Sequence, residues 1–301
     1  MHPVAFDSIE EVQLRLGQQG YFAGREIATV VFLAARLNKP LFLEGEAGVG
    51  KTEIARALAA TLGARLIRLQ CYEGLDAGHA LYEWNYPRQL LRIKLAEAAH
   101  EDAARIGHEI FSEEYLVKRP LLQALTSEGD VPPVLLIDEV DRADEEFEAF
   151  LLEILGDFQI TIPELGTIRA ETPPIVVLTS NRTREIHDAL KRRCLYLWVG
   201  YPAFERELEI IRARVPGLNE RLARQLCTFM ERARAEDFYK RPGVAETIDW
   251  GMALVALHRD HLDAAAVDET LGCIFKYVDD IESFRSRKLF ESMAEALEAA
   301  G

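Results

Sequence analysis

The chain has 301 residues, which is long enough for one large hydrophobic core and a second, smaller one. Apolar residues make up 49% and charged residues 28% of the sequence, the balance of a soluble globular protein. The 35 Lys and Arg residues against 50 Asp and Glu residues give a formal net charge of −15. This charge argues against broad electrostatic attachment to nucleic acid or anionic lipid, while a local basic patch stays compatible with it.

No apolar stretch approaches the ~20 residues that span a bilayer, and Met1–Asp7 lacks the basic and apolar regions of a secretory signal. The cysteines form no C-x-x-C pair, so we expect reduced, packed thiols and neither a zinc site nor a disulfide framework. They are Cys71, Cys194, Cys227 and Cys273. These features predict a cytoplasmic protein without a transmembrane segment.

A predicted strand near residues 41–44 leads into a motif of the form G-x-x-x-x-G-K-[ST], and a predicted helix over residues 51–62 follows. In this strand, loop and helix setting, successive backbone N–H groups turn onto the phosphates of a nucleoside triphosphate. Lys51 can reach the β and γ phosphate oxygens, and the Thr52 hydroxyl can bind Mg²⁺. The predicted ATP-binding loop consists of Gly45, Glu46, Ala47, Gly48, Val49, Gly50, Lys51 and Thr52.

A second strand is expected near residues 65–70, and an irregular segment, residues 71–91, follows it. This segment is dense in aromatic residues, and we predict that it forms a hairpin. The aromatic residues either pack within the hairpin or contact another protein, since aromatics favour strands in any case. They are Tyr72, Tyr82, Trp84 and Tyr86.

A third predicted strand, near residues 134–138, is a continuous apolar run that ends in Asp138 and Glu139. Ligands gather at the carboxyl ends of parallel strands that are buried on both faces. We therefore predict that Asp138 lies beside the phosphates and holds Mg²⁺, and that Glu139 orients or deprotonates the attacking water. The pair could instead begin an ordinary helix. The acids that follow are interpreted as first-turn residues favoured by the helix dipole, namely Asp141, Asp144, Glu145 and Glu146.

Residues 158–172 contain the turn residues Pro163 and Gly166 and predict a second hairpin. A fourth strand, expected near residues 175–180, ends at the polar residue Asn181. A basic run, residues 191–193, precedes the fifth predicted strand near residues 195–199. By itself this run would be interpreted as a solvated turn or a helix C-terminus.

The chain resembles an AAA+ ATPase in the order of four motifs: the phosphate loop, the Asp-Glu strand end, the strand that ends in Asn, and the element Ala-Leu-Lys-Arg-Arg-Cys at residues 189–194. The resemblance implies that Asn181 is sensor 1, which positions the attacking water near the γ-phosphate. It also implies that Arg193 is an arginine finger acting on the nucleotide of a neighbouring subunit, with Arg192 as the alternative. Such fingers accelerate phosphoryl transfer roughly 10³–10⁵-fold. A finger that acts on a neighbour implies a ring, expected to be a hexamer.

The two predicted hairpins match in position the helix-2 insert and the pre-sensor-1 hairpin of the MoxR group of AAA+ proteins. Residues 72–75 and 81–86 are most similar to the CoxD-type accessory ATPase of molybdenum–copper carbon monoxide dehydrogenase maturation. This resemblance covers nearly the whole chain. It implies a von Willebrand factor A domain protein as partner and a metalloenzyme as client.

Strand and helix signals alternate up to about residue 200 and predict an α/β fold, an AAA+ P-loop NTPase core with a parallel sheet. Beyond this point the periodicity is helical, with helices expected at 203–214, 218–234, 247–258 and 266–283. We therefore predict a nucleotide-binding α/β domain over residues 1–200 and a smaller all-α lid domain over residues 201–301. Such lids let hydrolysis change the angle between domains.

The start of the lid departs from the AAA+ pattern. Family members often carry a sensor 2 Arg at the start of a lid helix, and the matching position here falls near Ala245. Arg241 lies about one turn earlier and could substitute, but Pro242-Gly243 more plainly marks a loop and a helix cap. His258 and His261 have helical spacing for a metal but no third ligand in the sequence, so they are interpreted as a surface pair.

These observations predict a MoxR-type AAA+ ATPase that hydrolyses Mg²⁺-bound ATP in a ring to remodel or mature a client metalloenzyme, such as carbon monoxide dehydrogenase. A nucleic-acid motor or clamp loader is the alternative of another class, which the net charge of −15 disfavours. A nucleotide-gated binding protein with little turnover is a second alternative, because the sensor 2 residue is absent from its usual position.

Overall fold

The computed structural model describes residues 6–300, and its contacts divide the chain into two compact units. The sheet unit comprises Met1–Arg15, Gly24–Glu44 and Thr52–Trp198, and the helical unit comprises Leu16–Ala23, Gly45–Lys51 and Val199–Gly301. The predicted domain boundary at residue 200 stays a prediction. Most of the N-terminal segment on which the expectation of no targeting signal rests lies outside the described residues.

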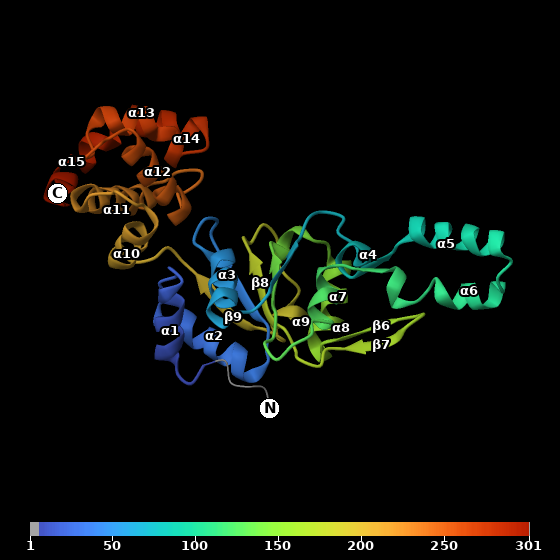
Figure 1. The fold of residues 1–301 in the computed structure, drawn as a ribbon. Helices are drawn as coiled ribbons and strands as arrows, with labels where there is room; N and C mark the ends of the chain where they lie inside the picture. The colour runs from blue at the N-terminus through green and yellow to red at the C-terminus, as the bar shows by residue number, and fades with distance from the viewer. Residues whose placement is uncertain (1–5, 301) are drawn as a thin grey trace. The chain divides into compact units, whose positions relative to one another are not determined.

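The sheet unit is built on a five-stranded sheet with the strand order β2-β5-β8-β1-β9. Figure 1 labels two of these strands, β8 and β9. The pairs β2–β5, β5–β8 and β8–β1 are parallel. All five predicted strands are present, which confirms the α/β fold, since continuous apolar runs are typical of parallel strands buried on both faces. Their bounds are β1 Leu41–Gly45, β2 Leu66–Gln70, β5 Val134–Asp138, β8 Ile175–Ser180 and β9 Leu195–Val199.

Helices cover this sheet, and α7 and α8 share a hydrophobic core with it. Ile137 of β5 and Leu178 of β8 belong to the same buried cluster as Leu121 and Leu151, which lie on two of the helices. The helices and turns around the sheet are α1 Ile9–Gln18, α2 Arg25–Leu37, α3 Lys51–Leu62, α7 Pro120–Leu125, η2 Val140–Arg142, α8 Glu145–Asp157 and α9 Asp188–Lys191.

The predicted hairpin over residues 71–91 is wrong. The strand β3 pairs antiparallel with β4, which lies more than 30 residues later, and two helices occupy the intervening chain. The chain enters a helix after β3 because Asn85 caps it, accepting a hydrogen bond from the Arg88 amide at 3.1 Å, and Pro87 stands in its first turn. The elements are α4 Ala77–Ala80, β3 Tyr82–Trp84, α5 Tyr86–Ala99, α6 Ala103–Glu109, η1 Glu113–Tyr115 and β4 Leu116–Lys118.

The aromatic residues of this insert divide into buried and exposed ones. Trp84 is 7% exposed and packs edge-on against Phe111 and Tyr82, with ring centroids 5.3 and 6.1 Å apart. Tyr72 and Tyr86 are exposed. The helices α5 and α6 contact each other and lie away from the central sheet (Figure 1). Trp84 is therefore a packing residue of the insert.

The second predicted hairpin, within residues 158–172, is confirmed. β6 Gln159–Ile162 and β7 Gly166–Arg169 pair antiparallel, between α8 and β8 in the chain. Ile160 and Ile162 alternate with exposed or half-exposed positions and belong to the core of the sheet unit. One face of the hairpin is therefore anchored to that core.

The helical unit contains six helices from residue 204 onward among the described residues. The predicted helix over residues 266–283 is wrong, because the chain is extended at Phe275 and two helices flank it. The Phe275 ring packs on Phe238 and Phe284, with centroids 4.5 and 5.8 Å apart, so burial of this ring interrupts the helical periodicity. The helices are α10 Phe204–Arg214, α11 Glu220–Ala235, α12 Val244–Ala256, α13 Ala264–Ile274, α14 Val278–Ser286 and α15 Leu289–Ala300, the last of which was not predicted.

Candidate functional site

The predicted phosphate loop joins the end of β1 to the start of α3. Gly48 and Gly50 have φ angles of 76° and 92°, a left-handed conformation that glycine adopts without steric cost. The Lys51 side chain is buried, and its ammonium donates to the carbonyl oxygens of Gly45 and Glu46 at 2.7 and 2.6 Å. The loop therefore closes around the lysine that would bind phosphate oxygens.

Asp138 lies at the carboxyl end of β5 with only 2% of its surface exposed. Its Oδ1 accepts hydrogen bonds from the hydroxyls of Thr52 at 2.9 Å and Thr179 at 2.6 Å. Its Oδ2 accepts from Arg68, from Nε at 3.0 Å and Nη2 at 2.6 Å. The structure thus brings together Thr52 and Asp138, which lie 86 positions apart in the chain.

Glu139 and Asn181 are also brought together. The Asn181 side-chain amide donates to Glu139 Oε1 at 3.4 Å, and the Gln70 amide donates to Oε2 at 3.0 Å. Glu139 itself has a φ of 55°, and its backbone N–H donates to the Thr179 hydroxyl at 2.9 Å. This left-handed residue turns the chain at the end of β5, and its carboxylate lies within hydrogen-bond distance of the Asn181 amide.

The interpretation of Asp141 as a first-turn residue is wrong. Its buried carboxylate accepts from the Asn181 and Thr183 backbone amides, at 3.2 and 2.9 Å, and from the Thr183 hydroxyl at 2.7 Å. The reason is local, since Asp141 lies in the short turn η2 and not in α8. The same interpretation is confirmed for the other acids: Asp144 caps α8 through the Phe147 amide, at 2.9 Å, and Glu145 and Glu146 occupy its first turn.

Arg192 and Arg193 follow α9 and are both exposed. The segment before them is held to α8 by Glu148, which accepts from the His187 amide at 2.8 Å and pairs with Arg184. Asp141 and Glu148 therefore anchor the chain between Asn181 and the two arginines at two places. The role of either arginine as a finger stays a prediction.

Three residues of this network escaped the sequence interpretation: Arg68, Gln70 and the side chain of Thr179. Gln70 lies opposite Asp138 in the β2–β5 register, and Arg68 is on the same face of β2, two residues earlier. Their polarity at the carboxyl end of a predicted strand is the signal that could have found them. Their partners could not be found in this way, because the strand order is not encoded locally.

The donor set fits a magnesium-bound nucleoside triphosphate. The Thr52 hydroxyl and the Asp138 carboxylate are adjacent oxygen donors, the type that Mg²⁺ prefers. The phosphate loop offers backbone N–H groups and the Lys51 ammonium, the type that phosphate oxygens accept. Lys51 and Thr52 are consecutive residues, so the phosphate-binding side chain and the metal-binding hydroxyl are neighbours in the chain.

The region that was expected to hold sensor 2 is a helix cap. Gly243 is the N-cap of α12, and its amide donates to Glu246 Oε2 at 2.8 Å, so the expected loop and cap at Pro242-Gly243 are confirmed. Arg241 is exposed and lies three residues before the helix. Ala245 donates its backbone N–H to the Gly48 carbonyl of the phosphate loop at 3.1 Å, and both residues belong to the helical unit.

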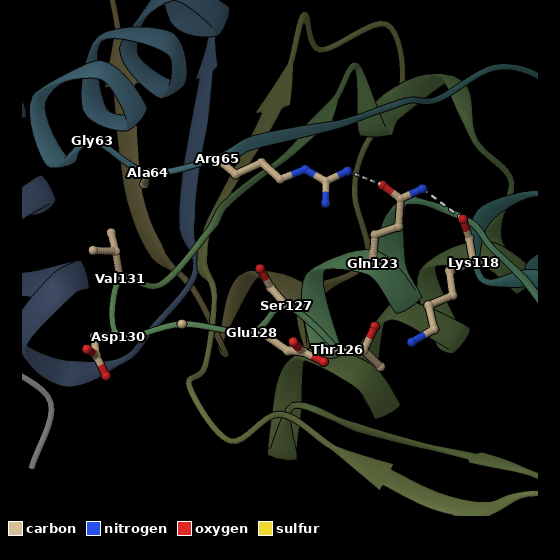
Figure 2. A pocket seen from close by; sticks show the side chains of 11 residues that line it. Gly63, Ala64, Arg65, Lys118, Gln123, Thr126, Ser127, Glu128, Asp130 and Val131 are labelled. Atoms are coloured by element: carbon tan, nitrogen blue, oxygen red, sulfur yellow. Dashed lines mark hydrogen bonds between the residues drawn. The ribbon is translucent and has the colours of Figure 1, made fainter. Parts of the chain in front are cut away.

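A surface pocket of about 540 Å³ lies at the amino ends of β2 and β5, opposite the end of the sheet that carries Asp138 (Figure 2). The Gln123 side chain crosses it, accepting from Arg65 at 3.0 Å and donating to the Lys118 carbonyl at 2.7 Å. Acidic and basic side chains both line it. Because Asp138 ends β5, this pocket is separate from the candidate site. Its lining residues are Gly63, Ala64, Arg65, Lys118, Gln123, Thr126, Ser127, Glu128, Gly129, Asp130 and Val131.

His258 and His261 lie in the turn after α12 and not on a helix, and His258 is exposed. Within residues 6–300, no group of three His, Cys, Asp or Glu side chains has an arrangement that could hold a metal. His261 instead contacts Asp260, at 2.6 Å. Both histidines lie at the surface, as predicted, but neither lies on a helix.

The four cysteines are free thiols, and Cys71 and Cys227 are buried. Burial raises the pKa of the Cys71 thiol to about 12, and the nearby Asp138, Asp141 and Glu139 carboxylates contribute to this rise. Burial likewise raises the pKa of Cys227 to about 12. No helix among the described residues combines the length and the apolar character that a membrane crossing requires.

A parallel sheet with a phosphate loop after one central strand and an Asp-Glu pair at the end of another defines a P-loop nucleoside triphosphatase fold. The family model of the AAA domain (dynein-related subfamily) matches residues 40–194, a segment that includes every predicted catalytic residue. The chain belongs to this family of AAA+ ATPases, whose domain binds nucleotide.

Individual relatives are distant. YeaC of Bacillus subtilis, an uncharacterized protein, is 24% identical over 80% of this chain and 68% of its own length. The uncharacterized protein SERP0979 of Staphylococcus epidermidis is 26% identical over 66% of this chain and 70% of its own. The chain is also similar to the RuvB Holliday junction branch migration motor of Thermotoga maritima, with a TM-score of 0.47 and 17% identity over 98% of this chain and 80% of that one.

Proposed function

We propose that this protein hydrolyses ATP with Mg²⁺ and uses the hydrolysis to remodel a client protein, as a MoxR-type AAA+ chaperone. The observation that carries the hydrolysis is the group formed by Thr52, Asp138, Glu139 and Asn181. Thr52 and Asp138 lie 2.9 Å apart and supply oxygen donors for the metal, and Glu139 and Asn181 lie 3.4 Å apart and can hold one water. Magnesium, when bound, neutralises charge that develops on the phosphates.

Each residue has a distinct part in this proposal. Lys51 binds the β and γ phosphates, Glu139 takes the proton of the attacking water, and Asn181 orients that water. Thr179 holds Asp138 and Glu139 at once, since its hydroxyl donates to the first and accepts from the amide of the second. It is a positioning residue.

Two variants test the hydrolysis. Lys51→Ala should abolish ATP binding in equilibrium titrations, whereas Glu139→Gln should retain bound ATP and lose turnover. Glu145→Gln is the matched control, because Glu145 is an exposed acid in the first turn of α8 and should leave turnover unchanged. Wild-type turnover by both site variants would reject the assignment, and a wild-type protein that binds ATP without turnover would support the gated binding protein.

The proposal includes a hexameric ring in which Arg193 of one subunit acts on the nucleotide of the next. Its exposure after α9 supports this role, because a finger must be free to reach a neighbour. Specific activity should then rise with protein concentration as rings assemble. Mixing Arg193→Ala with Lys51→Ala subunits should restore part of the activity, since the first keeps an intact loop and the second an intact finger. If mixing with Lys51→Ala subunits restores activity to Arg192→Ala and not to Arg193→Ala, Arg192 is the finger.

For the client, we propose a metalloenzyme whose metal site is completed with help from this protein and a von Willebrand factor A domain partner, in the cytoplasm. The support is the similarity of residues 72–75 and 81–86 to the CoxD-type ATPases, together with the β6–β7 hairpin at the position expected for the MoxR group. In a pull-down from its native host, the Glu139→Gln protein with ATP should retain the client metalloenzyme and the von Willebrand factor A domain partner. The Lys51→Ala protein should retain neither. Maturation of a molybdenum–copper enzyme that is unaffected by Glu139→Gln would reject this client.

A further inference from the structure

The phosphate loop and the start of α12 are in direct contact within the helical unit. The Ala245 backbone N–H donates to the Gly48 carbonyl at 3.1 Å. Ala245 is the second residue of α12, and its N–H is one of the first-turn donors that have no partner inside their own helix. The helix therefore uses one of its unsatisfied donors to hold a carbonyl of the loop.

This hydrogen bond orients the next peptide group of the loop. The peptide bond between Gly48 and Val49 is planar and trans, so its carbonyl and its N–H point in opposite directions. Holding the Gly48 carbonyl on α12 consequently turns the Val49 N–H away from α12. Backbone N–H groups of this loop are the donors for phosphate oxygens, and a donor that is oriented in advance binds an anion without a cost for reordering.

The close approach requires glycine at position 243. A Cβ at Gly243 would lie 2.8 Å from the Ala47 carbonyl oxygen and 3.0 Å from the Gly48 carbonyl carbon. Both are backbone atoms of the loop, so the loop or the helix would have to move. The φ of Gly243 is −86°, which any residue adopts, so glycine is needed here for space and not for its conformation.

A buried ion pair holds the start of α12 in place. The Arg234 guanidinium donates to both carboxylate oxygens of Glu207, at 2.5 and 2.7 Å, and its Nε donates to the Pro242 carbonyl at 2.8 Å. The Thr247 hydroxyl donates to Glu207 Oε1 at 2.7 Å. Residues on both sides of Gly243 are thus tied to one rigid group.

We infer that the start of α12 is a brace that orients the Gly48–Val49 peptide for phosphate binding, with Gly243 and Arg234 as positioning residues. The inference rests on the proposed nucleotide binding and deepens it. At the position where the AAA+ resemblance predicts a sensor 2 arginine, this chain contributes the Ala245 backbone N–H, which acts on the phosphate groups through the loop. The ligand is the polyphosphate of a nucleotide.

The first test is Gly243→Ala, with Gly272→Ala as the matched control. Gly272 lies within α13, and a Cβ there meets nothing within 4 Å. Titration calorimetry of the full chain with Mg²⁺ and ATP should show binding about 10-fold or more weaker for Gly243→Ala, the effect of losing one hydrogen bond to a charged group. Steady-state kinetics should show a raised KM at nearly unchanged kcat, because uniform phosphate binding is lost. Gly272→Ala should match the wild type.

The second test, Ala245→Pro, removes the donor without adding bulk to the cap. Proline is tolerated in the first turn of a helix. Ala265→Pro places proline at the same position of α13, where Ala265 is exposed, and serves as the control for any cost to folding. Ala245→Pro should weaken ATP binding by about the same factor as Gly243→Ala, at a thermal stability equal to that of Ala265→Pro.

The outcomes separate the two proposals. If the wild type binds ATP and both variants bind it as tightly, the brace is wrong and the proposed nucleotide binding stands. If the wild type itself fails to bind ATP with Mg²⁺, the proposed function is wrong.

Discussion

Two arginine–carboxylate pairs of this protein differ in their exposure to solvent. In the sheet unit, Asp138 is 2% exposed, but the side chain of its partner Arg68 is 46% exposed. In the helical unit, Glu207 and Arg234 have side-chain exposures of only 2% and 8%. The second pair is enclosed and hydrogen-bonded by the protein, whereas the arginine of the first pair can move into solvent.

The difference teaches what each pair can do. Arg234 is held by Glu207 and the Pro242 carbonyl and stacks over the Tyr201 ring, with its Cζ 4.7 Å from the ring centroid. Removing one member would leave a buried charge without a partner, so this pair supports the structure. Arg68 is half exposed, so its guanidinium can move into solvent when another cation takes its place at the Asp138 carboxylate. The open pair is suited to ligand exchange and the closed pair to positioning.

The largest effect is expected from opening the closed pair. Arg234→Met should lower the free energy of unfolding of the helical unit by about 3–5 kcal/mol, because Glu207 stays buried and uncompensated. Urea denaturation of the full chain, followed by tryptophan fluorescence, measures it, and Trp250 is the buried tryptophan of the helical unit. Arg212→Met is the control, since the Arg212–Glu220 pair is exposed and should matter little. Equal losses in both variants would contradict the closed character of the Arg234 pair.

A smaller effect is expected at Asp141, which holds the chain after Asn181. Asp141→Asn replaces a carboxylate oxygen by an amide donor that faces N–H groups. We therefore expect the free energy of unfolding to fall by about 1–3 kcal/mol and ATP hydrolysis to slow. ATP affinity should stay unchanged, because Asp141 acts through Asn181. Asp144→Asn is the matched control, since Asn caps a helix as well as Asp does. If Asp141→Asn weakens ATP binding as much as it slows turnover, Asp141 does not act through Asn181.

A third effect concerns the open pair and should appear in the Mg²⁺ requirement of the ATPase. Arg68→Met removes the cation that shares Asp138 Oδ2, so Mg²⁺ should meet less competition there. The Mg²⁺ concentration for half-maximal ATPase activity should fall about 3–10-fold. Arg65→Met, three residues earlier in the chain and bonded to Gln123, is the control. A higher Mg²⁺ requirement would mean that Arg68 assists binding of the nucleotide.

The smallest effect at neutral pH is expected at Cys71, beside the open pair, because its contribution changes only in alkaline solution. Its thiol pKa is raised from 9.0 to about 12, so the folded state keeps the proton while the unfolded state loses it. This contribution to stability is complete below pH 9 and disappears as the pH rises from 9 to about 12. The stability of the wild type relative to Cys71→Ala should therefore decline over this range in urea titrations. A constant difference would contradict the raised pKa.

Local sequence features were sufficient for the sheet and for part of the candidate site. The strands of the parallel sheet are continuous apolar runs, and the phosphate loop and the Asp138-Glu139 pair lie where such strands end. The second hairpin was found because Pro163 and Gly166 separate two strand-like segments. The first predicted hairpin was wrong, because the Asn85 cap and Pro87 mark a helix start and outweigh the aromatic strand signal.

What the sequence by itself determined were the elements whose signals lie within one strand, one loop or one turn: the phosphate loop, the five strands and the caps. Only the tertiary structure decided the contacts between them. Thr179 meets Asp138 and Glu139 because β8 lies beside β5, Asp141 reaches Asn181 from another strand end, and Ala245 meets Gly48 across almost 200 residues. Local periodicity records whether a side chain is buried but not which partner it meets, because partners are set by strand order and helix packing.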